Sequence, residues 1–424
     1  MDMAGESDTQ VPSIRTLIAL SVPSILVGIV SALILFALER VSDLIERGVW
    51  TSLPRAMGVD PSSAWWIFGV LTLTGLAVGL SLWLVPGHGG RDSATTELIA
   101  PPLPLGVLPS LILVTVLGLA GGVSLGPENP IIAINTGVLV ALVARLWPKV
   151  PGDLVVIITA AATIGALFGT PVAAALVFTG VVAALPKGGA LWDRLFLPLV
   201  AAGAGSITMS LLTRPVFALN VPPYDKIAPV DLLSAAVIAS AGALIGLIAA
   251  VALKPVHHAF RLLRNPVLFV TAGGAILGVL GVIGGPITLF KGLSQMGQLV
   301  DERSQDTVAQ LALIVAVKLV ALIIAAAAGF RGGRVFPAVF VGAAVGVLAN
   351  AMLPGIPLAL AVAAGVLGVV LAIARDGWIA LFIGVAVTGG VMVLPVLCIA
   401  ILPAWLLVSR APEMLVPAES KKSD

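Results

Sequence analysis

The chain has 424 residues, of which 59% are hydrophobic and only 10% are charged. A mean hydropathy of +1.13 excludes an ordinary soluble domain and indicates an all-α polytopic membrane protein. The net charge of +2, with no basic run interleaved with aromatic residues, gives no support for a nucleic-acid partner. The single cysteine, Cys398, excludes an intramolecular disulfide framework.

The two ends of the chain are polar. Residues 1–13 are acidic and lack the pattern of a signal peptide, so we expect a retained cytosolic tail there. Residues 410–424 predict a second cytosolic tail, without fixed structure. Between the tails we expect two transmembrane halves, 14–213 and 231–409, joined by a loop-like linker at 214–230. The expected location is the cell inner (plasma) membrane, although the Lys and Arg of the loops do not fix the orientation.

The apolar stretches are long enough to cross a bilayer as helices, which takes about 20 residues. Residues 17–38 and 65–85 meet that need without interruption. Later stretches are interrupted by some of the 46 glycines and 30 prolines, which predicts short, tilted or paired half-helices. These stretches are 103–120, 131–147, 154–185, 195–212, 230–253, 267–289, 308–328, 335–353, 356–374 and 378–408.

One acid lies in the middle of this apolar sequence. In 117–132, LGLAGGVSLGPENPII, Glu128 is the only ionisable side chain between Glu97 and Arg145. A lone carboxylate is costly in hydrocarbon, so it should face a water-filled path or a partner. The surrounding glycines and prolines break a continuous helix, which a membrane tolerates only where the backbone lines a cavity or is packed in protein.

Three glycine-rich breaks predict helix starts that point into a pocket. They are PGHGGRDSATTE at 86–97, GPENP at 126–130 and GFRGGRVFP at 329–337. Unpaired N–H groups at a helix start carry roughly half a positive charge, so converging starts make an anion site. Arg91, Arg331 and Arg334 at these breaks are compatible with an anion. The segments AGGVSLGPENPII and AGFRGGRVFPAVF also form a weak repeat, as expected of an inverted-repeat transporter.

These segments resemble the CLC family of chloride channels and proton-coupled chloride antiporters. GGVSLGPENP is similar to the family signature GGxxLGREGP, with Glu128 at the position of the gating glutamate. GGRVFP resembles the GxFxP motif, and PGHGGR falls where GSGIP is expected. FGTPVAAALVF, at 168–178, resembles the stretch that follows the glutamate motif. The resemblance extends over about 17–408.

The resemblance implies a CLC-like inverted-repeat fold with tilted and broken helices, and a homodimer with one pore per subunit in the lipid bilayer. Chloride or another halide would be held by backbone amides and blocked by Glu128. The amides of Arg334 and Val335 would bind the central anion, and those of Glu128 and Asn129 an outer one. His88 would stand in place of a coordinating serine. The implied anion-binding residues are His88, Gly87, Gly89, Gly126, Asn129, Gly333, Arg334 and Val335, with Pro127, Pro130 and Pro337 as the motif prolines; no cofactor or metal is implied.

The departures from the family pattern favour a channel-like or weakly coupled transporter. Pro127 replaces the arginine of GREGP and removes one N–H group, and Val335 replaces the phenylalanine of GxFxP. His88 offers either ring nitrogen in place of the serine hydroxyl and gains charge near its usual pKa of about 6.5. Gly390 falls where the pore tyrosine is expected. Val181 aligns with the inner proton glutamate of the antiporters, so a proton acceptor for tight coupling is lacking.

Three alternatives remain at this stage. The chain could be a proton-coupled chloride antiporter with an unusual proton route through His88, or a non-conducting degenerate CLC that acts as a sensor or partner protein. An intramembrane enzyme is disfavoured, because paired acids, an HExxH motif or a serine with a general base are not evident in the spans. We interpret Lys318 as a structural partner of a helix end, and His257 and His258 as interfacial residues and not as a metal site.

Overall fold

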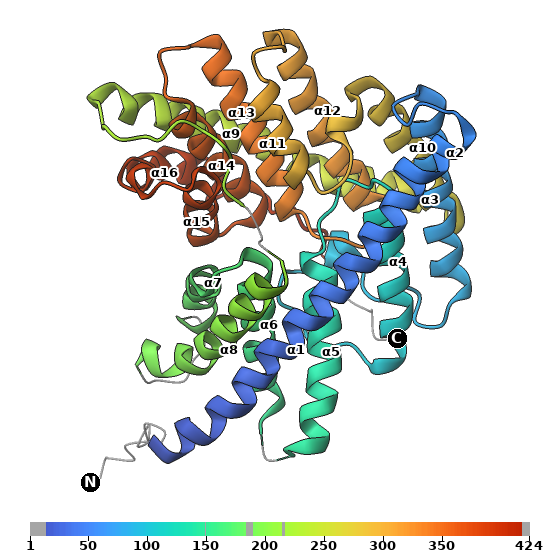
Figure 1. Ribbon diagram of the computed structural model, residues 1–424, viewed down its shortest axis with the longest axis vertical. Helices are drawn as coiled ribbons and strands as arrows, with labels where there is room; N and C mark the ends of the chain where they lie inside the picture. Colours follow the sequence, from blue (N-terminus) through green and yellow to red (C-terminus); the bar gives the residue numbers. More distant parts are fainter. Residues whose placement is uncertain (1–13, 149, 184–189, 214–216, 418–424) are drawn as a thin grey trace. The chain divides into compact units, whose positions relative to one another are not determined.

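The computed structural model describes residues 14–148, 150–183, 190–213 and 217–417, and is almost entirely helical (Figure 1). Over these residues the predicted all-α class is confirmed, and the β-type pairing consists of one isolated bridge, between Gly126 and Gly333. The tail predicted at 1–13 lies outside the described residues. The helices are α1 (Ile14–Arg47), α2 (Leu53–Met57), α3 (Ala64–Leu84), α4 (Leu108–Ala120), α5 (Glu128–Leu146), α6 (Gly152–Phe168), α7 (Pro171–Ala183), α8 (Leu191–Leu212), α9 (Pro229–Arg261), α10 (Pro266–Gly284), α11 (Leu293–Glu302), α12 (Val308–Ala327), α13 (Val335–Met352), α14 (Leu358–Ala374), α15 (Gly377–Thr388) and α16 (Leu394–Val408).

Among the described residues, nine helical stretches are long and apolar enough to span a membrane. The first is longer than predicted, because α1 continues through a π-helical turn into α2, so that the stretch covers Leu17–Met57. The predicted breaks are confirmed in two places. The apolar stretch 154–185 divides into α6 and α7 at Gly169, which has a φ of +66°, and 378–408 divides into α15 and α16.

The described residues divide into two compact units, 14–37 with 138–213, and 38–137 with 217–417. In the first unit, α6 and α8 pack closely through small residues. A Cβ added at Gly165 would lie 2.5 Å from the carbonyl oxygen of Ala202, and one at Gly205 would lie 2.6 Å from that of Ala162. Such close approach is how membrane helices gain packing energy, because lipid provides no hydrophobic drive between them.

The second unit contains all three glycine-rich breaks and therefore the candidate site. In it α3 packs on α10, and α14 packs on both α9 and α13. Glycines lie at each of these crossings, and α14 is buried from Leu358 to Ile373. The start of α13 is therefore fixed within a closely packed group of helices.

The described part of the linker, 217–228, contains no helix, and the C-terminal tail is more ordered than predicted. The α8 helix ends at Leu212 and α9 begins at Pro229, two residues before the predicted boundary. The hydroxyl of Tyr224 donates to Oδ2 of Asp231 at 2.6 Å and ties the linker to α9. The prediction of a tail without structure is wrong for the residues up to 417. Met414 is 1% exposed, and the N–H of Val416 donates to the carbonyl of Ala94.

Candidate anion site

Two of the predicted helix starts meet in the second unit. The segments before α5 and α13 pair reciprocally, since the N–H of Gly126 donates to the carbonyl of Gly333 at 2.9 Å and the N–H of Gly333 donates back at 2.7 Å. A Cβ added at either glycine would overlap the Glu128 carboxylate, so a larger residue at either position would displace that side chain. Pro127, just before α5, lacks an N–H, which a helix start does not require. The start of α5 therefore lies beside the start of α13.

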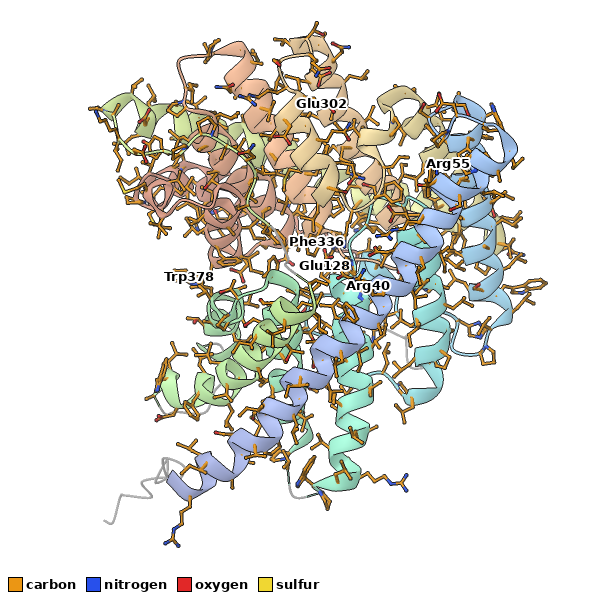
Figure 2. The ribbon with its side chains drawn as sticks, in the orientation of Figure 1. Arg40, Arg55, Glu128, Glu302, Phe336 and Trp378 are labelled. Atoms are coloured by element: carbon orange, nitrogen blue, oxygen red, sulfur yellow. The ribbon has the colours of Figure 1, made fainter. Side chains whose placement is uncertain are left out.

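Glu128 places its carboxylate on the first N–H groups of α13. Oε1 accepts from the N–H of Val335 at 2.7 Å and from that of Phe336 at 3.3 Å. The residue is 2% exposed, and Figure 2 shows Glu128 beside Phe336. N–H groups in the first turn of a helix have no partner within the helix and favour an anion. The carboxylate thus occupies the position that a bound anion would take.

The second oxygen of this carboxylate is not used. Oε2 of Glu128 is buried and has no hydrogen-bond partner among the described residues. A buried carboxylate oxygen without a partner costs free energy, more than the roughly 1–3 kcal/mol of a neutral group. The contact with α13 is therefore only half satisfied.

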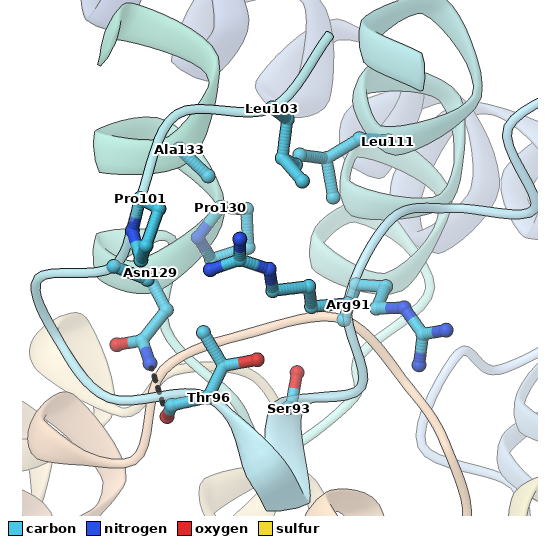
Figure 3. A pocket seen from close by; sticks show the side chains of 11 residues that line it. Arg91, Ser93, Thr96, Pro101, Leu103, Leu111, Asn129, Pro130 and Ala133 are labelled. Carbon is cyan, nitrogen blue, oxygen red and sulfur yellow. Dashed lines mark hydrogen bonds between the residues drawn. The ribbon is translucent and has the colours of Figure 1, made fainter. Parts of the chain in front are cut away.

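Arg334 and Asn129 extend from the two helix starts to one carbonyl oxygen. Nη2 of Arg334 donates to the oxygen of Thr96 at 3.1 Å. Nδ2 of Asn129 donates to the same oxygen at 3.4 Å, the contact that Figure 3 marks with a dashed line. This shared contact connects the segment after α3 to both helices. Of the predicted prolines, Pro337 is buried in the first turn of α13.

A cavity of about 30 Å³ lies next to Asn129 and Pro130. Figure 3 shows Ser93, Thr96 and Asn129 on one side of it, and Leu103 and Leu111 on the other. The volume exceeds the 10–15 Å³ or so that one water needs, and the polar side offers hydrogen-bond partners. The cavity has room for a water or a small ion beside the residue that follows Glu128.

His88 is not brought to the Glu128 carboxylate by any described contact. Its Nδ1 lies 2.8 Å from the carbonyl oxygen of Leu82, and the side chain is exposed. Gly87 and Gly89, with φ of +92° and +67°, form the turn around it. The side chain of Ser93, in the same segment, contacts the approach to α13: its Oγ accepts from the N–H of Gly332 at 2.8 Å.

Sequence reasoning overlooked Ser93. The signal was present in the dipeptide Asp92–Ser93, because aspartate and serine before a short helix are capping residues. The Asp92 side chain accepts from the N–H of Ala94 and caps the 3₁₀ turn Ser93–Thr95.

A family model described as "Voltage gated chloride channel" matches residues 75–409. The chain belongs to the voltage-gated chloride channel (CLC) family. It is 46% identical to the "Putative ion-transport protein YfeO" of Shigella boydii serotype 4 and of Escherichia coli (strain K12 / DH10B), over 96% of this chain and 96% of each relative. The family places the chain among multi-pass membrane proteins of anion transport and not among enzymes.

Solved CLC structures share the fold. A CLC-type fluoride/proton antiporter aligns with a TM-score of 0.74 and 20% identity, over 95% of this chain and 98% of its own. A slow cyanobacterial Cl⁻/H⁺ antiporter aligns with a TM-score of 0.76 and 18% identity, over 92% and 95%. The predicted CLC-like fold with broken helices is therefore confirmed.

This CLC chain holds its glycine-rich connection in place with a charged cluster. Asp92 pairs with Arg261 and, at 3.6 Å, with Arg331, and its Oδ2 lies 3.1 Å from Nε2 of His257. Arg331 also donates to the carbonyls of Gly89 and Gly90. His257 is thus a member of an ion cluster, whereas the sequence predicted only an interfacial residue. The described residues contain no group of three or more possible metal ligands.

The Asp92 carboxyl lies in the segment that connects α3 to α4, outside the membrane-spanning helices. Burial by itself would raise the pKa of Asp92, but the contact with His257 and the charges of Arg331 and Arg261 outweigh it. Together they hold the pKa well below its usual range. Asp92 therefore stays ionised through the whole physiological pH range.

Proposed function

We propose that this chain moves a small inorganic anion, chloride or another halide, across the membrane through a CLC-type pore gated by Glu128. The observation that carries the proposal is the carboxylate of Glu128 on the amides of Val335 and Phe336. A carboxylate and a halide compete for such N–H groups, because both are anions that the helix start favours. The pore conducts when the side chain leaves the amides and the halide replaces it.

Protonation is the simplest trigger for this exchange. A neutral carboxyl group loses its attraction to the start of α13, and a halide then competes more successfully for the same amides. Lower pH should therefore increase flux. The described contacts agree with a side chain that is released, since only one of the two oxygens of Glu128 has partners.

We further propose channel-like or weakly coupled transport. Val181 of α7 stands where the resemblance places the inner proton acceptor, and α7 contains no acid. The antiporters named above are 20% and 18% identical to this chain, so they share its fold without deciding its coupling. We also propose a homodimer in the inner membrane, with one pore per subunit, to be checked by the mass of the purified protein in detergent.

The test is anion efflux from liposomes that hold the purified protein, wild type or Glu128→Gln. Valinomycin in potassium buffer shunts the counter-charge, and a proton ionophore is added separately. We expect wild-type efflux that needs the valinomycin shunt, drives no protons uphill and rises as pH falls. Glu128→Gln should conduct with little pH dependence, because its side chain carries no charge at any pH.

Two outcomes would contradict parts of the proposal. Uphill proton movement driven by a chloride gradient would replace weak coupling with proton-coupled antiport. The absence of halide flux in both proteins would remove the conduction proposal and leave a degenerate CLC that serves as a sensor or partner protein.

A further inference from the structure

Arg334 carries a buried nitrogen that the structure does not use. It is the residue before α13, and its Nη2 donates to the carbonyl of Thr96 at 3.1 Å. Its Nη1 is buried and has no hydrogen-bond partner among the described residues. Among the described residues, no ion pair includes Arg334. A guanidinium normally binds carboxylates or other anions through several N–H groups at once. Here one of these groups is left free inside the protein.

The neighbouring arginine provides a contrast. Arg331 is three residues earlier and donates to the carbonyls of Gly89, Gly90 and Gly329. Its charge is also balanced by Asp92. Arg331 is therefore used in holding the segment between α3 and α4. Arg334 forms no ion pair among the described residues, and only the more distant carboxylates of Glu128 and Glu413 attract its charge.

The free nitrogen of Arg334 has a counterpart of opposite charge. Oε2 of Glu128 is likewise buried without a partner, while Oε1 of the same carboxylate binds the amides of Val335 and Phe336. Nη2 of Arg334 shares the oxygen of Thr96 with Asn129, the residue directly after Glu128. The guanidinium therefore lies near the Asn129 side chain, in the first turn of α5.

We propose that the Arg334 side chain binds the transported anion together with the amides of Val335 and Phe336. This inference rests on the proposed function. When the Glu128 carboxylate leaves, the guanidinium, whose nitrogens lie more than 4 Å from both Glu128 oxygens, moves toward the amides, and Nη1 donates to a halide held there. The backbone amides alone offer partial charges, so the formal charge of Arg334 should set how tightly the site holds a halide.

The experiment is titration calorimetry of the purified full-length protein in detergent, with chloride and with fluoride as probes. All proteins carry Glu128→Gln, so that the competing carboxylate is neutral. We compare this background with added Arg334→Gln, Arg334→Lys, Asn129→Ala or Arg91→Gln. Asn129→Ala removes the other donor to Thr96 without changing the charge. Arg91→Gln removes a charge at an exposed residue that lines the neighbouring cavity.

We expect Arg334→Gln to weaken halide binding about tenfold or more, the effect of losing one charge-assisted hydrogen bond. Arg334→Lys should recover part of the affinity, and Arg91→Gln should leave it unchanged. Asn129→Ala should weaken halide binding less than Arg334→Gln, because Asn129 carries no charge. A purely structural role of Arg334 at Thr96 would make the two losses equal.

The inference is overturned if Arg334→Gln binds both halides as tightly as the background, or if Asn129→Ala reproduces its loss in full. Either result leaves the proposed function in place, because the background protein still binds halide. A background protein that binds neither halide contradicts the proposed function itself and the inference with it. Thermal unfolding of each variant identifies any protein that has failed to fold.

Discussion

At the scale of single residues, Asp92 is the anion that pairs with the largely buried Arg331 and with the partly exposed Arg261. We predict that Asp92→Asn lowers the stability of the protein by about 3 kcal/mol, the usual cost of leaving a buried charge unpaired. The pKa of Asp92 is depressed in the folded state. The contribution of Asp92 to the free energy of unfolding is therefore complete above its pKa in the unfolded chain, about 3.9. It is lost as pH falls toward the lower pKa of the folded state. The difference in melting temperature between wild type and variant should stay constant from about pH 5 to pH 8 and shrink below about pH 4.

A matched control for this prediction is Asp60→Asn. Asp60 is an exposed aspartate whose pKa is lowered by hydrogen bonds from Ser62 and not by ion pairs. Its substitution should change the melting temperature little at any pH. An equal loss of stability for Asp92→Asn at pH 3 and at pH 7 would show that the ionised carboxylate is not what stabilises the cluster.

At the scale of elements, α12 holds the turn that follows α10 through one buried lysine. Nζ of Lys318 donates to the carbonyls of Thr288, Leu289 and Phe290 at 2.9, 3.0 and 2.7 Å. The N–H of Phe290 in turn donates to the carbonyl of Gly122, in the break before α5. We predict that Lys318→Met lowers the stability by about 3 kcal/mol, because three carbonyls lose their donor in a buried place.

The measurement for this prediction is thermal unfolding in detergent, with Lys254→Met as the control. Lys254 is exposed near the end of α9, so its loss should have little effect. If Lys318→Met unfolds at the wild-type temperature, then other groups or water satisfy the three carbonyls. The sequence predicted Lys318 as a structural partner of a helix end. This is confirmed, because Lys318 donates to the carbonyl of Thr288, the last residue of a 3₁₀ turn.

At the scale of the whole molecule, the sequence predicted the segments that form the candidate site. It predicted less well which side chains contact one another there. Glycine, proline and one acid in apolar sequence located the breaks at Glu128 and Val335, because a bilayer permits few other arrangements. The contact of Ser93 with Gly332 was not predicted, and the anion-binding role of His88 stays a prediction. Four consecutive residues, 87–90, have positive φ, and the His88 side chain in this turn is exposed. Long-range partners such as Asp92 and His257 leave no periodic signal in a single sequence.

The packing of the second unit rests on glycines where helices cross, and this gives the last prediction. A Cβ added at Gly368 of α14 would overlap the carbonyl of Ala239 in α9. Because the obstacle is backbone, it cannot swing aside, and Gly368→Ala should destabilise the protein by about 1–3 kcal/mol. Gly297→Ala in α11 is the matched control, since nothing lies within 4 Å of its added Cβ. Alanine favours a helix over glycine by up to about 1 kcal/mol, so Gly297→Ala should raise the melting temperature slightly. Equal shifts of the same sign in the two variants would mean that helix propensity, and not close helix contact, governs the stability of this unit.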